Sequence, residues 1–181
     1  MFDSFFAKLD EKFLSIMFDG LLCSKYEISY VFEKDGEIAG FITASTNTKK
    51  LFNEILKKRM QALLGVILAG LFRNPHFLCQ LVESFFYSKK TLVNDTHAEL
   101  LFITIEPRYR KRKLSKELIK TVLDQLHKMS VFKVKVTTQR KNYVVNKLLE
   151  GLQFKQVRSF SFYGKVNLVY EVALADDRKY I

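Results

Sequence analysis

Apolar residues recur along the chain with two different periods, and the changes from one period to the other predict the order of helices and strands. Near the N-terminus they follow the three-to-four-residue spacing of a helix that buries one face, which predicts a helix over about 3–22. Alternating apolar and polar residues then predict strands over 26–33 and 38–46. The Asp-Gly pair at 35–36 is typical of a two-residue hairpin turn, because both residues tolerate positive φ. Gly40 indicates a bulge or a close approach of a neighbouring backbone.

The segment 48–97 has a different character. From 48 to 87 the pattern is helical, with an interruption at Asn74-Pro75, where proline suits the first turn of a second helix. Residues 88–97 are polar and read as a loop. We therefore expect a helical hairpin inserted between two strands. Its expected apolar face consists of Leu51, Phe52, Ile55, Leu56, Leu63, Ile67 and Leu71.

Beyond this insertion, strands and helices alternate. The expected strands are 98–106, 131–137, 154–163 and 166–174, and the expected helices are 114–129 and 142–152. Alternation that ends in a pair of strands predicts a three-layer α/β/α sandwich on a mixed β-sheet. With 181 residues, 48% of them hydrophobic, the chain is expected to form a single domain over 1–181.

The charge is unevenly distributed. The formal net charge is +11, and residues 1–97 hold 12 Lys+Arg against 11 Asp+Glu, whereas residues 98–181 hold 18 against 8. An anionic ligand is therefore expected in the C-terminal half, and a merely solvated basic surface is the plainer alternative. Cys23 and Cys79 lack metal-type spacing and are expected to be inert core thiols. The absence of a signal-like N-terminus and of a long apolar run predicts a soluble, cytoplasmic protein.

A basic turn separates one strand from the next helix. In the segment 103–119, ITIEPRYRKRKLSKELI, the strand stops at Pro107 and a helix opens at Leu114. Such a turn directs backbone N–H groups and the positive end of the helix to one spot, which suits a phosphate. Five cations surround it: Arg108, Arg110, Lys111, Arg112 and Lys113.

Position by position, this segment resembles motif A of the GNAT acyl-coenzyme A N-acyltransferases. The matching residues are Ile103, Ile105, Pro107, Tyr109 and Arg110, while Lys113 and Ser115 stand where two glycines are usual. Residues 142–154 resemble motif B of the same family. There Asn142, Glu150, Leu152 and Phe154 agree with common choices, whereas Val145, Leu148, Leu149 and Gln153 replace the usual Ala, Phe, Tyr and Gly.

The resemblance implies a GNAT-like sandwich in which 98–174 is the acyl-coenzyme A-binding half and 48–97 is an insertion. It also implies acetyl-coenzyme A as acyl donor, no metal, and direct attack by a primary amine. The acceptor would be a small molecule such as an amino sugar or polyamine, or a protein amine. The residues implied to bind the donor are Ile103, Ile105, Arg110, Lys111, Arg112, Lys113, Leu114, Ser115 and Asn142. Lys113 would fit in place of glycine if its φ is helical and its Cβ points away.

Glu99 is the candidate catalytic base. It lies eleven residues before Arg110, which is the offset of the glutamate base in the histone-acetylating branch of the family. An exposed glutamate at the start of a strand is the plainer interpretation, and His97 is an alternative group for proton transfer. Glu106 is expected to face solvent. Leu149 occupies the position of the usual tyrosine, so no general acid is assigned.

Two other functions remain open from sequence. Loss of the motif glycines and of the tyrosine is compatible with a catalytically impaired GNAT-fold binding module. The apolar stretch 51–72, with basic residues beside it, is compatible with a peripheral membrane or polyanion-binding protein. Packing of this stretch on the core or in a homodimer is the favoured interpretation. No recognition motif for specific nucleic-acid binding is present.

Overall fold

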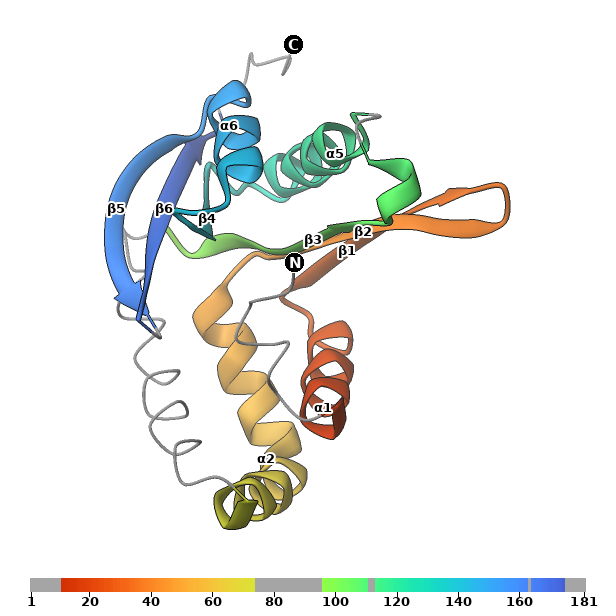
Figure 1. Cartoon of the computed structure of the whole chain (residues 1–181), viewed down its shortest axis with the longest axis vertical. Coiled ribbons are helices and arrows are strands. Elements are labelled where there is room, and N and C mark those ends of the chain that lie inside the picture. Colours follow the sequence, from red (N-terminus) through yellow and green to blue (C-terminus); the bar gives the residue numbers. More distant parts are fainter. Residues whose placement is uncertain (1–10, 74–95, 111–112, 163, 175–181) are drawn as a thin grey trace.

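The computed structural model describes residues 11–73, 96–110, 113–162 and 164–174. Its strands form one mixed sheet, and helices lie against both faces (Figure 1). The strands are β1 (Glu27–Lys34), β2 (Glu37–Ser45), β3 (Ala98–Ile105), β4 (Lys133–Gln139), β5 (Lys155–Phe162) and β6 (Lys165–Ala173). The helices are α1 (Glu11–Leu22), α2 (Thr48–Arg73), α5 (Leu114–Lys128) and α6 (Tyr143–Gly151), with a short 3₁₀ turn at Pro107–Tyr109.

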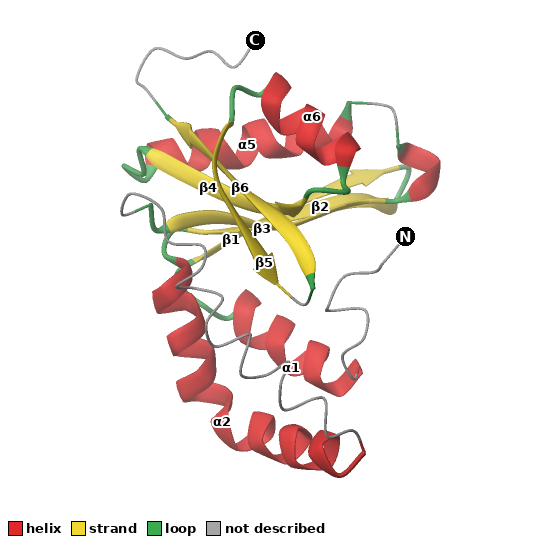
Figure 2. Cartoon of the chain, turned by 60° about the vertical axis from the view of Figure 1, so that its left-hand side comes forward, coloured by secondary structure: helices red, strands yellow, loops and turns green. Residues whose placement is uncertain are grey.

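The six-stranded sheet has the order β1-β2-β3-β4-β6-β5. All neighbouring strands are antiparallel except β3 and β4, which are parallel and joined through α5. Helices α1 and α2 lie on one face of the sheet, and α5 and α6 lie on the other (Figure 2). The predicted three-layer sandwich is thus confirmed. Of the expected helical hairpin, α2 is present between β2 and β3, and the second helix falls outside the described residues.

The first hairpin forms as its turn chemistry predicts. Asp35 and Gly36 have φ angles of 54° and 76°, which the two-residue turn requires. Gly40 marks a close approach, because a Cβ built there would lie 2.6 Å from Cδ1 of Ile105 and 2.8 Å from the carbonyl oxygen of Thr104. The absence of a side chain at Gly40 therefore lets β2 lie against the end of β3.

The core has two parts, one on each side of the sheet. The larger cluster lies between the sheet and helices α5 and α6, and a smaller one joins α1 to α2 around Leu21, Leu51 and Ile55. Leu56 was expected on the buried face of α2, and this is wrong: it is exposed, as are Met60 and Leu64 one and two turns later. The neighbouring Leu51, Ile55 and Leu63 already fill the face that packs, so Leu56 points away from it. The side chains of Ile67 and Leu71 are outside the described part.

Two further expectations concern cysteine and the membrane. Cys23 is exposed rather than buried, because it follows the last residue of α1 in the turn that leads to β1. Cys79 lies outside the described residues. Within the residues that the structure describes, no helix is both long enough and apolar enough to cross a membrane.

Candidate active site

The sheet opens between its two parallel strands. β3 and β4 are paired only where Ala98–Leu100 faces Val134–Val136. Beyond these residues β3 continues along β2, and β4 continues along β6. The β2–β3 register also steps from Ala44↔Leu100 to Thr43↔Phe102, which makes Leu101 the extra residue of a β-bulge. A bulge bends and twists its strand, so it accounts for the divergence of β3 from β4 at this point.

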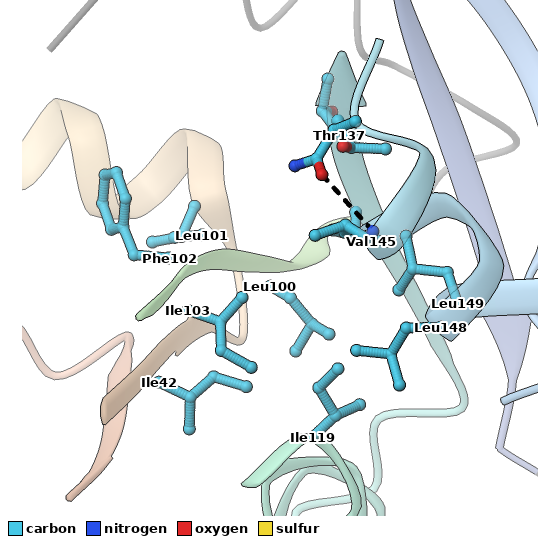
Figure 3. Close-up of a pocket in the computed structure, with 13 residues that line it drawn as sticks. Ile42, Leu100, Leu101, Phe102, Ile103, Ile119, Thr137, Val145, Leu148 and Leu149 are labelled. Carbon is cyan, nitrogen blue, oxygen red and sulfur yellow. Dashed lines mark hydrogen bonds between the residues drawn. The ribbon is translucent and has the colours of Figure 1, made fainter. Parts of the chain in front are cut away.

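A pocket of about 160 Å³ lies at this opening (Figure 3). Its lining comes from β2, β3, β4, α5 and α6, and it is mostly apolar: Ile42, Leu100, Leu101, Phe102, Ile103, Ile119, Val136, Thr137, Thr138, Asn142, Val145, Leu148 and Leu149. Two residues expected to bind the donor, Ile103 and Asn142, are among these. Asn142 also caps α6, since its side-chain oxygen accepts a hydrogen bond from the N–H of Val145 at 3.4 Å.

The basic turn leads from the end of β3 into α5. Arg110 Nε donates to the carbonyl oxygen of Ile105 at 3.1 Å, and the side chain of Tyr109 is buried. Lys113 has φ 62° and ψ 2°, a left-handed conformation, and its carbonyl oxygen accepts the first helical hydrogen bonds of α5. The expected helical φ is therefore wrong. Lys113 instead adopts the backbone conformation that glycine favours, at the position where the family usually has one.

The other residues near this turn that were expected to bind the donor differ in their exposure. Leu114 is buried, Ser115 is half-buried in the first turn of α5, and Lys111 and Arg112 lie outside the described residues. Ile105 is buried beneath the turn and is not part of the pocket lining. The turn and the pocket are thus connected through β3, at whose end the turn begins.

The missing glycine of motif B shows the same change of residue without a change of backbone conformation. Gln153, in place of the motif B glycine, has φ 65°. The N–H of Phe154 bonds to the carbonyl of Leu149 at 3.0 Å, and that of Gln153 bonds to Glu150 at 2.9 Å. This is the Schellman arrangement, which usually has glycine at the left-handed position. It buries Phe154 against the end of α6.

Glu99 is not an exposed residue at the start of a strand. It is only 1% exposed, and two side chains of β4 hold its carboxylate. The Thr137 hydroxyl donates to Oε1 at 3.2 Å, and the Lys135 ammonium lies 3.7 Å from Oε2. Because Thr137 lines the pocket, Glu99 is one hydrogen bond away from it. Sequence reasoning missed Lys135 and Thr137, since lysines alternating with valines on one strand usually indicate a solvent-facing side.

The remaining candidates lie away from this carboxylate. Glu106 is exposed, as expected, and lies 3.9 Å from Arg108 in a surface ion pair. His97 is exposed, and its backbone carbonyl accepts from the N–H of Thr48. Leu149 is 1% exposed and lines the pocket, so the position of the family's tyrosine offers no proton there.

Comparison with known proteins agrees with this geometry. The model of the acetyltransferase (GNAT) family matches residues 2–154. Among curated proteins, no sequence matches. Many solved structures share the fold at low identity. One is the ribosomal-protein-S18-alanine N-acetyltransferase of Escherichia coli, with 13% identity, a TM-score of 0.57, and coverage of 96% of this chain and 82% of that one.

Two more were solved with acetyl-coenzyme A. A putative streptothricin acetyltransferase of Bacillus anthracis is 13% identical, with a TM-score of 0.56 and coverage of 87% of this chain and 68% of that one. NAA60 of Arabidopsis thaliana is 17% identical, with a TM-score of 0.55 and coverage of 88% and 83%.

The family match spans most of the chain, so the protein belongs to the GNAT acetyltransferases. It is accordingly an acetyltransferase that uses acetyl-coenzyme A as its acyl donor.

Proposed function

We propose that the protein transfers the acetyl group of acetyl-coenzyme A to a primary amine, with Glu99 as the base that accepts the amine proton. The observation that carries this proposal is the buried Glu99 carboxylate, which is hydrogen-bonded to a residue that lines the pocket between β3 and β4. The acceptor is a small amine or a protein amine.

The residues present fit the acyl donor. The apolar pocket at Ile103 and Asn142 suits the thioester arm. Lys113 turns the chain so that α5 begins with its N-terminal amides at the end of the basic turn, and such amides favour phosphate. The donor supplies an acetyl group activated as a thioester. Every other requirement, namely orientation, exclusion of water and removal of a proton, falls to the side chains of the protein.

The proposed reaction balances with a single base. The amine nitrogen forms a bond to the acetyl carbonyl carbon as the carbon–sulfur bond breaks, and coenzyme A leaves as its thiolate, which takes a proton from water. The proton lost by the amine goes to Glu99, and Leu149 supplies none to the sulfur. Holding both reactants together provides most of the acceleration. A base contributes about 10²–10⁴-fold more, which sets the expected defect of the Glu99→Gln variant.

The test measures release of the coenzyme A thiol with a thiol-reactive dye, across a panel of amines and peptides with free N-termini or lysines. Acetyl-coenzyme A affinity, measured by calorimetry, provides the control. We expect turnover with at least one amine, a fall of about 10²–10⁴-fold in Glu99→Gln, and unchanged donor affinity in that variant. Equal turnover in the two proteins would overturn the role of Glu99.

One observation favours a second function. The apolar Leu149 replaces the family's tyrosine and offers no proton to the leaving sulfur, which favours a module that binds acetyl-coenzyme A without transferring its acetyl group. The same two measurements separate the two functions. Donor binding with no thiol release for any amine would support the binding module.

A further inference from the structure

A line of polar side chains crosses the sheet beside Glu99. The strand register places Ser45 opposite Glu99, Glu99 opposite Lys135, and Lys135 opposite Glu171. The residues on either side of them in these strands, such as Leu100 and Val134, belong to the core cluster under α5 and α6. Because side chains alternate along a strand, the polar line faces the opposite layer, which contains α1 and α2 (Figure 1).

Lys135 and Glu99 form the buried charged pair of this line. Its side chain is 4% exposed, that of Glu99 is 2% exposed, and their charged atoms lie 3.7 Å apart. Desolvation of such a pair offsets much of its attraction, so an apolar pair of the same size would stabilise the fold equally well or better. Stability alone therefore does not explain the presence of a buried lysine next to the candidate base.

The other charges around Glu99 are more distant or already engaged. Glu171 is the cross-strand neighbour of Lys135, and it accepts a hydrogen bond from the Thr96 hydroxyl. Glu27 on β1 is opposite Ser45, the β2 neighbour of Glu99. Lys155 on β5 is opposite Glu171, the β6 neighbour of Lys135.

The described side chains of the adjacent strand and of α2 that lie near Glu99 are neutral or already paired. β2 contributes the neutral Ser45, and α2 packs with Leu51 and Ile55. Glu54 on α2 is held by Ser24 and Lys58, and the neighbouring His97 is exposed. Among the described residues, Lys135 places its positive charge 3.7 Å from Oε2 of the Glu99 carboxylate.

We propose that Lys135 is a positioning residue for acetyl transfer, which holds the Glu99 carboxylate ionised and directed toward Thr137 at the pocket. The inference rests on the proposed role of Glu99 as base. A carboxylate buried without its counter-charge retains a proton, and a protonated carboxyl group does not accept one from the amine. Lys135 thus sets the lower end of the pH range over which the enzyme works.

The perturbation is Lys135→Met, which preserves the length of the side chain and removes its charge. Lys135→Arg is the matched control, because it preserves the charge. We expect the acid limb of the pH profile of kcat/KM to move upward by about 1–3 pH units in Lys135→Met. We expect Lys135→Arg to remain near the wild type. The added substitution Glu171→Gln in Lys135→Met removes the facing negative charge and is expected to move the limb partly back.

The profile is measured at saturating acetyl-coenzyme A, from about pH 5 to about pH 9. A second readout is independent of turnover: carbon-13 NMR of protein labelled at the glutamate carboxyl carbon, with the Glu99 signal assigned from Glu99→Gln. We expect its protonation midpoint to move together with the acid limb. Thermal unfolding of each variant confirms that it is folded.

The outcomes separate the two proposals. If Glu99→Gln is impaired but the midpoint and the limb are the same in the wild type and in Lys135→Met, the role of Lys135 is overturned while Glu99 remains the base. If Lys135→Arg moves the limb as far as Lys135→Met, charge is not the cause and the inference is again overturned. If Glu99→Gln has full activity, the proposed base fails, and the NMR midpoint alone still reports whether Lys135 controls Glu99.

Discussion

Replacing Lys113 by glycine and, separately, by alanine distinguishes what its backbone contributes from what its charge contributes. Both variants lose the ammonium group. Only glycine adopts φ 62° without the close contact between Cβ and the following carbonyl oxygen. The difference in stability between the two variants therefore measures the backbone strain where the basic turn enters α5. The difference in donor affinity between both variants and the wild type tests whether the side chain takes part in binding the phosphates of the donor.

The magnitude follows from this conformation. A left-handed residue other than glycine costs about 1–2 kcal/mol, and glycine loses about 0.5–1 kcal/mol more chain entropy on folding than alanine does. Lys113→Gly should therefore be more stable than Lys113→Ala by about 0.5–1 kcal/mol, which is a few degrees in Tm for a chain of this size. Both variants also lose a cation beside the positive end of α5. Its loss should raise the free energy of unfolding of each variant by about 0.3–1 kcal/mol, so it does not affect the difference between them.

For binding, the exposed ammonium is expected to act as a surface charge. An exposed pair is worth about 0.2–1 kcal/mol, so both variants should bind acetyl-coenzyme A up to about fivefold more weakly at low salt. The difference should shrink at about 1 M salt, where screening acts within about 3 Å. Calorimetry at both salt concentrations and thermal unfolding measure the two effects. Equal stability of the two variants would refute the strain argument, and unchanged affinity at low salt would refute the role of the charge.

Three further outcomes are expected from the fold. Gly40→Ala should lower the free energy of unfolding by about 1–3 kcal/mol, because its Cβ would meet Ile105 at 2.6 Å; in thermal unfolding the control Gly151→Ala, with nothing within 4 Å, should show no loss. Gln153→Gly should raise the free energy of unfolding in urea by about 0.5–1 kcal/mol, and a decrease would contradict the strain assigned to its φ of 65°. Burial raises the pKa of Glu27, so the folded protein holds this proton more tightly than the unfolded chain does. The free energy of unfolding should therefore fall as pH rises from the ordinary pKa of a glutamate to the raised pKa of Glu27. Glu27→Gln should abolish this fall in unfolding curves measured across that pH window, and an unchanged dependence of stability on pH would exclude Glu27 as its source.

The elements were predictable because their signals are local. Asp35 and Gly36 require no tertiary information to form a turn, and the period of the flanking strands fixes which side chains face the core. Leu56 could not be assigned, because α2 is apolar on more than one face and only its packing partners decide which face is buried. Periodicity identifies a helix, but it does not identify the neighbour of that helix.

The site was predictable in position but not in environment. The strand, turn and helix around Lys113 were recognised from order and spacing, and Glu99 from its offset along β3. The burial of Glu99 was not, because it depends on Lys135 and Thr137 of a strand that comes more than thirty residues later. In the sequence Lys135 is indistinguishable from its neighbour Lys133, which is exposed at the start of the same strand. Only the register of β3 against β4 brings one of the two lysines to the carboxylate.

Two of the three missing motif glycines, those replaced by Lys113 and Gln153, point to the same physical conclusion. Lys113 and Gln153 keep φ values of 62° and 65°, so the backbone path of both motifs survives a change of residue that each motif would seem to forbid. The cost is about 1–2 kcal/mol at each position, which the core can offset because both left-handed residues adjoin buried ones, Leu114 and Phe154. Backbone conformation, rather than glycine itself, is therefore what the basic turn requires. A lysine in that conformation adds positive charge at the end of α5 that a glycine would lack.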